Sequence, residues 1–361
     1  MQRIKVNEKS FEGQTIYVGI DYHKLNWMVT IMSDFGEHKT MSYSPCPVKL
    51  TGYLQKNFPG GTYKAVYEAG FSGFATCRKF LELGVECIVI HAADVPTNQK
   101  ERLQKTDKAD SRKLARCLRS GELSGVHLPD SVLEVRRALV RQRHRIVKDI
   151  GRYKNRVKSL LFQIGIRIPE RFTPNQSRHW SRPFIEWLKS IPDHPEGIRE
   201  VIGNFVRIGE KLRGELLLVT RQVRQLSSSD SYREDFGLVT SSPGIGLVGG
   251  MTLLTELDDI KRFGHCDHLC GFVGLVPSMH GSGERMATGK MSRRGRKQLK
   301  NVLVEAAWAS IRKDPAMMAK YRELTKRMNG NKAIIRIARK LLNRVRYILI
   351  HRQEYEMGVM A

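Results

Sequence analysis

The stretch Tyr17-Val-Gly-Ile-Asp21 decides the fold class, because it has the pattern of an apolar strand that ends on a carboxylate. Apolar side chains alternate with others from Ile16, and residues 27–32 are strand-like again, so residues 16–35 are predicted to form a β-hairpin. Strands that alternate with helices indicate an α/β domain. The further strands and helices expected before residue 130 lie at 65–67, 72–83, 86–91 and 107–121.

After residue 130 the chain is predicted to be mainly helical. A long basic helix is expected over 131–164 and a second long helix over 198–226, with a break at 169–197 that contains proline and histidine. The clearest helices of the last part are 298–312 and 332–352. The expected domains are an α/β domain at 1–130, a helical, coiled-coil segment at 131–235 and a mainly helical C-terminal domain at 236–361.

Within the second long helix, apolar residues are spaced alternately four and three apart, which is the pattern of a short coiled-coil seam. These residues are Leu212, Leu216, Val219, Val223 and Leu226. Two interpretations stay open: a helical hairpin that packs on itself, or an arm through which copies of the chain associate.

The charge of the chain points to a polyanionic partner. Its 361 residues include 62 Lys and Arg against 36 Asp and Glu, a net charge of +26. Residues 1–130 hold 18 basic and 14 acidic residues, whereas residues 131–361 hold 44 and 22. This asymmetry suggests a near-neutral catalytic part followed by a part that binds nucleic acid.

The chain is expected to act in the bacterial cytoplasm, with no membrane association. Its start is polar and charged, so no signal peptide is expected. Residues 236–255 carry no charged side chain but contain a proline and five glycines, so a membrane helix is not expected there. The six cysteines show no disulfide framework, which fits a reducing compartment.

Four acids are candidates for a metal site. Asp21 and Glu68 each end a predicted strand, and Asp107 and Asp110 lie three apart at the start of a predicted helix, on one face of it. Acids so placed can converge at one edge of a sheet. Carboxylate oxygens are the ligands that Mg²⁺ prefers, and two such ions can clamp the attacking and leaving oxygens of a phosphodiester. Singly, each acid has an ordinary explanation as a turn or helix-capping residue, so the order of all four carries the prediction.

The motifs in their order resemble one known family. The N-terminal motifs are Gly19-Ile-Asp21-Tyr-His23-Lys24, then Glu68, then Thr106-Asp107-Lys-Ala-Asp110. The C-terminal motifs are Ser242-Pro-Gly-Ile-Gly246, Gly271-Phe-Val-Gly-Leu-Val-Pro277, Gly281-Ser-Gly283, Gly289-Lys-Met-Ser-Arg-Arg-Gly295 and Leu303-Val-Glu-Ala-Ala307. This chain resembles the DEDD insertion-sequence transposases of the IS110 family, to which the Piv-type DNA invertases are related.

The resemblance implies a RuvC-like (RNase H-type) N-terminal domain, a coiled-coil segment and a C-terminal transposase domain. It also implies catalytic and metal-binding roles for Asp21, Glu68, Asp107 and Asp110, and the role of nucleophile for Ser282. The implied partners are donor DNA, target DNA, a structured guide (bridge) RNA from the same element and further copies of the chain, as a dimer that assembles to a tetramer. One departure is local: Glu284-Arg285 follows Ser282-Gly283 where members often have Gly-Lys.

Ser282 lies between two glycines, which allow the backbone to approach a phosphate closely. Four basic residues follow and could neutralise charge on a phosphoryl group: Arg285, Lys290, Arg293 and Arg294. Without the resemblance, Gly-Ser-Gly would be interpreted as a flexible linker. A serine hydroxyl needs activation to attack, which a metal ion can supply.

Two further motifs have competing interpretations. Residues 242–246 resemble a helix-hairpin-helix turn, in which the N–H groups of Gly244 and Gly246 would contact the DNA backbone, but an ordinary Pro-Gly turn has the same pattern. The segment 265–270, with two histidines and two cysteines, imitates half of a zinc site. Because no second cluster follows, a helix with buried cysteines is favoured there.

The function predicted is that of a site-specific DNA recombinase, guided by RNA, that forms a phosphoserine intermediate with two Mg²⁺ ions as cofactors. Alternatives are a metal-dependent hydrolytic nuclease or junction resolvase that uses the four acids and water, and a non-catalytic nucleic-acid-binding protein. Covalent protein–DNA adducts separate the first from the second, and metal-dependent cleavage separates both from the third.

Overall fold

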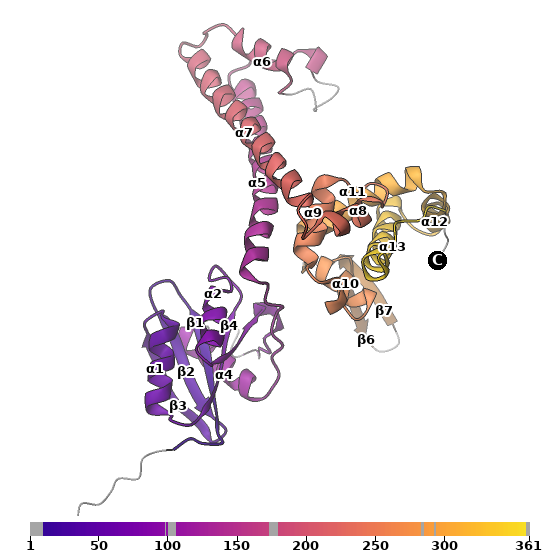
Figure 1. Cartoon of the computed structure of the whole chain (residues 1–361). Coiled ribbons are helices and arrows are strands. Elements are labelled where there is room, and N and C mark those ends of the chain that lie inside the picture. Colours follow the sequence, from indigo (N-terminus) through magenta and orange to yellow (C-terminus); the bar gives the residue numbers. More distant parts are fainter. Residues whose placement is uncertain are drawn as a thin grey trace, which may run out of the picture. The chain divides into compact units, whose positions relative to one another are not determined.

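The computed structural model describes residues 10–97, 99, 106–172, 180–282, 285–291 and 294–358. The chain divides into two compact units, Met1–Pro129 (unit 1) and Asp130–Ala361 (unit 2), which are described separately (Figure 1). Unit 1 is a mixed α/β structure and unit 2 is mainly helical, as the sequence predicted; unit 2 also contains one small hairpin that was not predicted.

Unit 1 is built on a five-stranded sheet with the order β3-β2-β1-β4-β5. Strand β2 runs antiparallel to both β1 and β3, whereas β4 is parallel to β1 and β5 is parallel to β4. The elements of unit 1 are β1 (Thr15–Tyr22), β2 (Trp27–Ser33), β3 (Gly36–Tyr43), α1 (Pro47–Asn57), β4 (Thr62–Glu68), α2 (Ala75–Glu82), β5 (Glu86–Ile90), η1 (Ala92–Asp94) and α4 (Asp107–Arg119).

Side chains of β1 point alternately to the two faces of the sheet, and each face packs against different helices. Ile16, Val18 and Ile20 are fully buried in a cluster with residues of α1 and α2. The opposite face of the sheet, which includes Val66 of β4, packs on Leu114 and other residues of α4. Because strand residues two apart share a face, Gly19 and Asp21 lie on the α4 side.

Most predicted elements of unit 1 are present, with two additions. The hairpin expected over residues 16–35 forms from β1 and β2. Strand β3 and helix α1 were not predicted. Strand β3 has mostly polar and exposed residues at the edge of the sheet, and α1 has a weak apolar pattern that begins at a proline.

Unit 2 contains two long helices and a set of shorter ones. Its elements are α5 (Ser131–Gln163), η2 (Glu170–Phe172), α6 (Arg182–Lys189), α7 (Ile198–Ser227), α8 (Arg233–Thr240), α9 (Leu247–Leu257), η4 (Ile260–Arg262), α10 (Cys266–Val273), β6 (Pro277–Ser282), β7 (Arg285–Met291), α11 (Lys297–Lys313), α12 (Pro315–Thr325) and α13 (Gly330–His351). The segment predicted as a break contains α6, which starts at a Ser181 cap and buries Phe184 and Leu188.

Helices α5 and α7 run side by side (Figure 1). Val219 and Val223 of the predicted seam are buried, and the other three seam residues are half-buried. The guanidinium of Arg143 on α5 donates a hydrogen bond of 2.9 Å to the Thr220 hydroxyl on α7. The seam therefore packs within the chain, as in the first of the two interpretations.

The base of this helical pair belongs to the C-terminal core. Val140 of α5 and Val223 of α7 are fully buried in one cluster with residues of α9, α10, α11 and α13. Most of the uncharged stretch 236–255 folds into α8 and α9, and α9 is buried from Gly250 to its end. In the part of the chain that the structure describes, no helix is long and apolar enough to span a membrane.

Candidate active site

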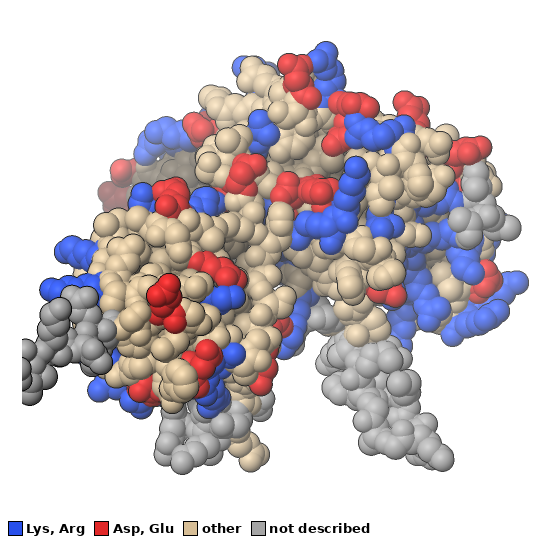
Figure 2. Space-filling view, turned by 60° about the horizontal axis from the view of Figure 1, so that its bottom comes forward, with Lys and Arg blue, Asp and Glu red and all other residues tan. Residues whose placement is uncertain are grey.

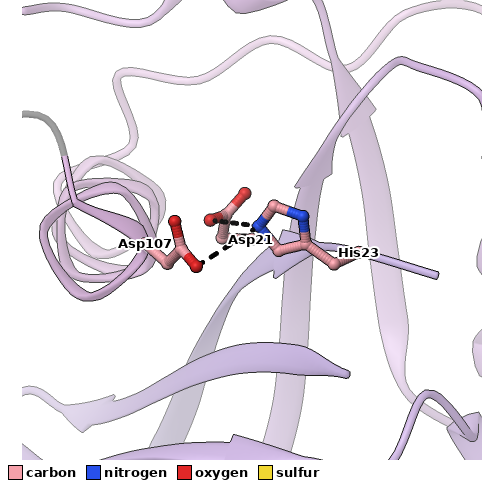
Figure 3. A group of neighbouring side chains, drawn as sticks. All are labelled: Asp21, His23 and Asp107. Carbon is pink, nitrogen blue, oxygen red and sulfur yellow. Dashed lines mark hydrogen bonds and ion pairs between the residues drawn. The ribbon is translucent and has the colours of Figure 1, made fainter. Parts of the chain in front are cut away.

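Two carboxylates meet one histidine at the end of β1 (Figure 3). The His23 Nε2 atom lies 3.1 Å from Asp21 Oδ2 and 3.6 Å from Asp107 Oδ2. One ligand atom from each of these residues lies within 4.8 Å of the other two, so the three can share one metal ion. We call Asp21, His23 and Asp107 the acid site.

A close backbone contact brings α4 to β1. A Cβ atom on Gly19 would lie 2.2 Å from the Ser111 carbonyl oxygen and 2.4 Å from the Ala115 nitrogen, so only glycine permits this approach. The Thr106 side chain accepts a hydrogen bond of 3.2 Å from the Ala109 N–H and thereby caps the helix one residue before Asp107. Helix α4 therefore begins beside the end of β1.

Hydrogen bonds anchor the same helix to the sheet. Buried Ser111 on α4 contacts Thr30 on β2 at 2.9 Å, and Thr30 contacts Thr40 on β3 at 2.9 Å. Further along the helix, Arg112 pairs with Glu37 at 3.0 Å. These contacts fix the position of Asp107 relative to Asp21.

The other two predicted acids lie next to the acid site without joining its three-residue cluster. Asp110, largely buried one turn after Asp107, pairs with Lys113 at 3.1 Å. Glu68 ends β4, and because Ile20 pairs with Tyr67, Glu68 follows at the level of Asp21 on the neighbouring parallel strand. All four acids thus come to one edge of the sheet, and of these Asp21 and Asp107 share the three-residue group with His23.

Burial raises the pKa of Asp21 above its ordinary value. The His23 hydrogen bond and charge act in the opposite direction, while the negative charges of Asp107 and Asp110 raise the pKa further. A carboxylate held among other carboxylates in a half-buried position has too little compensating positive charge. Such an arrangement favours occupation by a cation.

The donor set fits a hard divalent cation. Asp21 and Asp107 supply oxygen ligands, as Mg²⁺ requires, and both are partly accessible. The imidazole of His23 adds a nitrogen, which magnesium accepts less readily than the transition metals do. His23 belongs to the motif at 19–24, but it was not predicted from the sequence to be a site residue. The signal was its position two residues after Asp21, which places both side chains on one face of an extended chain.

Ser282 lies in a two-stranded hairpin of unit 2. Its backbone pairs with Arg285, the first residue of β7, and Lys290 lies near the end of β7. We call β6 and β7 the serine hairpin. Of the predicted phosphate-binding residues, Arg294 is exposed just after the hairpin, and Arg293 lies outside the described residues.

Two glycines lock the base of the serine hairpin. Gly274 ends α10 with a φ of 84°, and Gly295 precedes α11 with a φ of 103°. A Cβ atom on Gly295 would lie 2.6 Å from the Gly274 Cα atom, and one on Gly274 would lie 2.6 Å from the Arg294 oxygen. The Arg296 N–H also donates to the Phe272 carbonyl at 3.2 Å. Both glycines belong to predicted motifs, and the structure shows that they touch each other.

Behind this base, arginines surround a buried carboxylate. Glu256 of α9 is 3% exposed and accepts two hydrogen bonds from Arg141 of α5, at 2.6 and 2.8 Å. Arg137 and Arg296 lie 3.9 and 3.8 Å from the same carboxylate. Burial alone would raise the pKa of Glu256, but the arginines hold it below its ordinary value. One carboxylate thus ties α5 and α9 to the residue that starts α11.

The predicted helix-hairpin-helix turn lies between α8 and α9. Gly244 has a φ of 87°, and a Cβ atom there would lie 2.7 Å from the Ala306 oxygen of α11. Gly246 is the N-cap residue of α9, and both glycines are exposed. Ser310 of α11 donates a hydrogen bond of 2.7 Å to the Pro243 carbonyl. The turn is therefore fixed on α11 while its glycines remain accessible.

The histidines and cysteines at 265–270 do not form a metal site among the described residues. Cys266 and Cys270 lie one turn apart on α10 with their sulfurs 3.8 Å apart, and Cys270 is buried. The acid site is the only described group of three or more His, Cys, Asp and Glu side chains with ligand atoms this close.

Comparison with known protein families gives two matches. Residues 18–166 match the IS110 type of DEDD transposase, described as a transposase, and residues 237–322 match the transposase IS116/IS110/IS902 family. The first match contains the acid site, and the second contains the serine hairpin.

Individual relatives are also transposases by name. The chain is 31% identical to the predicted transposase y4qE of Sinorhizobium fredii over 67% of its own length and 57% of the relative. It is 26% identical to the transposase for insertion sequence element IS1533 of Leptospira borgpetersenii, over 68% of this chain and 70% of the relative. It is 24% identical to the transposase for insertion sequence element IS1111A of Coxiella burnetii, over 78% and 76%. The alignment thus spans a little over half of the first relative.

Proposed function

Because this chain belongs to the IS110 family of DEDD insertion-sequence transposases, we propose that it cuts and rejoins DNA by metal-assisted transesterification. The observation that carries the proposal is that Asp21 and Asp107, which are far apart in the sequence, have ligand atoms close enough to bind one metal ion. Phosphodiester chemistry needs such convergent carboxylates.

Each site residue has a proposed role. Asp21 and Asp107 hold the metal, and Glu68 and Asp110 complete the negative environment from the next strand and the next helical turn. Mg²⁺, as two ions, would supply Lewis-acid polarisation of the phosphoryl oxygens when bound. His23 contacts both carboxylates and holds them in position, and Lys113 balances the charge of Asp110.

Ser282 is the proposed nucleophile. Its hydroxyl loses a proton as Oγ bonds to phosphorus, the phosphodiester P–O bond breaks, and the departing oxygen takes up a proton to become a hydroxyl end. The phosphoserine link keeps the bond energy, so a second hydroxyl end can displace the serine and restore a phosphodiester without ATP. The acids belong to unit 1 and Ser282 to unit 2, so the active centre would require both units.

We also propose a finer assignment of the domains. The sheet order β3-β2-β1-β4-β5, with β1, β4 and β5 mutually parallel and acids at the ends of β1 and β4, supports a RuvC-like (RNase H-type) unit 1. The pairing of α5 with α7 supports a coiled-coil segment within 131–235, followed by a transposase domain from 236.

The basic unit 2 is proposed to bind donor DNA, target DNA and a structured guide RNA in the bacterial cytoplasm. On the face drawn in Figure 2, Lys and Arg side chains crowd over the C-terminal helices at the right. Helix α13 alone carries six Lys and Arg and no acid. The exposed Gly244 and Gly246 and the basic Arg285, Lys290, Arg293 and Arg294 would contact phosphates.

The second candidate is hydrolysis by the acid site alone. It is favoured by the position of His23, which lies beside both carboxylates in unit 1 and could take a proton from water. This activity would leave no covalent adduct with the protein.

Replacement of Asp107 tests the metal site. Asp107→Asn should reduce strand cleavage by at least about 100-fold, because it removes a ligand charge, while DNA binding by unit 2 stays within about twofold. The matched control is Asp34→Asn, in the β2–β3 turn at the other end of the sheet. Full cleavage by Asp107→Asn, assayed with Mg²⁺ on element-end DNA, would refute the proposal.

A further inference from the structure

An exposed aromatic ring stands at the rim of the acid site. Phe71 lies in the loop 69–74, which directly follows Glu68, and 63% of the residue is exposed. The Lys24 Nζ atom lies 5.9 Å from the centre of the Phe71 ring. Lys24 is the residue after His23, so the ring and the cation belong to the two segments that leave β1 and β4 at the acid site.

Fixed contacts hold the ring in this exposed position. The fully buried Tyr67 donates its hydroxyl to the Gly73 carbonyl at 3.0 Å and accepts from the Cys77 N–H at 3.2 Å, which ties down the loop. The Tyr22 ring packs against Phe71 at 5.6 Å, and its hydroxyl lies 3.0 Å from the Thr76 hydroxyl. Phe71 therefore lies exposed on an anchored loop, whereas Tyr67, which anchors that loop, is buried in the core.

We propose that Phe71 and Lys24 form a nucleotide-binding site beside the acid site. Phe71 stacks on one unpaired base, and Lys24 contacts a phosphate of the same strand. The proposal rests on the proposed function, because it assumes that the acid site acts on a nucleic-acid strand. It adds a positioning role for two residues that no metal or nucleophile role explains.

Charge and shape favour a nucleotide over an apolar protein segment. The carboxylates of Asp21 and Asp107 repel phosphate, so a strand that approaches them needs a nearby cation, and Lys24 directly follows His23 of the acid site. A flat ring next to an ammonium group complements a base joined to a phosphate. Stacking on an aromatic ring tolerates any base, so the site would align the strand without reading its sequence.

Photo-crosslinking to single-stranded DNA tests the site. Full-length protein is irradiated with strands that carry 5-iodouracil at successive positions, and the adducts are mapped by mass spectrometry. The adduct is expected on Phe71 and should disappear in Phe71→Leu. Phe71→Ala should weaken binding of the strand about tenfold, and Phe71→Trp should restore it.

Phe35 provides the matched control. It is 85% exposed in the β2–β3 turn, which lies at the end of the sheet opposite to Asp21. Phe35→Leu should leave both the adduct and the affinity unchanged. Equal effects of the Phe35 and Phe71 substitutions, or an adduct confined to unit 2, would overturn the inference. A change in self-association without a change in strand binding would assign Phe71 to a protein contact and would also overturn it.

The test separates this inference from the proposed function. If Phe71→Ala binds the strand normally while Asp107→Asn abolishes cleavage, only the inference fails. If Asp107→Asn cleaves normally, the proposed function fails whatever the adduct shows.

Discussion

The acid site rests on a five-stranded sheet, whereas Ser282 is the last residue of β6 in a two-stranded hairpin whose base is fixed by two glycines. In unit 1, the Gly19 contact and the Ser111–Thr30 hydrogen bond fix α4 on the sheet, so Asp107 cannot move without the helix. In unit 2, Gly274 and Gly295 join the two ends of the serine hairpin. The difference suggests that the acid site is preformed on a rigid sheet, whereas the proposed nucleophile is carried by a short hairpin that is fixed at its base.

The largest expected effect comes from Gly19→Ala. The added methyl group would overlap the backbone of α4, so the variant should lose about 3 kcal/mol or more of unfolding free energy in unit 1 and nearly all cleavage. Denaturant unfolding and cleavage assays measure both.

Gly52→Ala is its control, since a Cβ atom there has open space in helix α1 and alanine favours the helix. Unchanged stability of Gly19→Ala would mean that α4 does not depend on this contact.

A smaller and more selective effect is expected from Gly295→Ala. The φ of 103° and the overlap with Gly274 would displace the base of the serine hairpin, so strand joining should fall about tenfold or more. Metal binding by unit 1 should stay unchanged in isothermal titration. Gly271→Ala, which meets nothing, serves as the control. An equal loss of metal binding would contradict the separation of the two regions.

Self-association is expected to use the outer face of α7. Leu217 and Leu218 are 66% and 50% exposed, whereas the seam valines Val219 and Val223 are buried inside the chain. The double substitution Leu217→Glu with Leu218→Glu should shift the particle toward monomer in light scattering and leave the melting temperature within about 2 °C. An unchanged particle mass would exclude this face.

The smallest effect concerns the acidity of Asp21. Its pKa is raised in the folded protein, so without metal the folded state gains stability as the pH falls and loses it as the pH rises through the raised pKa. At neutral pH, Asp21→Asn should therefore raise the melting temperature of the metal-free protein by about 2 °C while abolishing cleavage. A lower melting temperature would show that the ionised carboxylate stabilises the fold.

The sequence predicted what local patterns encode. The end of the apolar strand at Asp21 and the cap before Asp107 each have a local signal, and both acids were selected. His23 was missed because its partner Asp107 is 84 residues away, and only the fold brings them together. The contact between Gly274 and Gly295 could not be predicted either. The sequence does not distinguish a glycine that a turn requires from a glycine that the close approach of another backbone requires.

The long helices show the same limit. Their ends were predicted within a few residues, since caps and apolar periodicity are local. The partner of the seam was left open because a 4-3 spacing fits a helix from the same chain as well as one from another copy. The uncharged stretch 236–255 was not predicted to be a membrane helix because of its proline and glycines, and much of it forms the buried helix α9.

The central claim is that the serine hairpin supplies the nucleophile to the acid site. The most direct measurement is mass spectrometry of a trapped reaction with Mg²⁺ and element-end DNA, after nuclease trimming. A nucleotide adduct on Ser282, absent from Ser282→Ala and from Asp107→Asn, is the predicted result. An adduct on Ser278 or Ser292, or strand joining by Ser282→Ala, would contradict the claim.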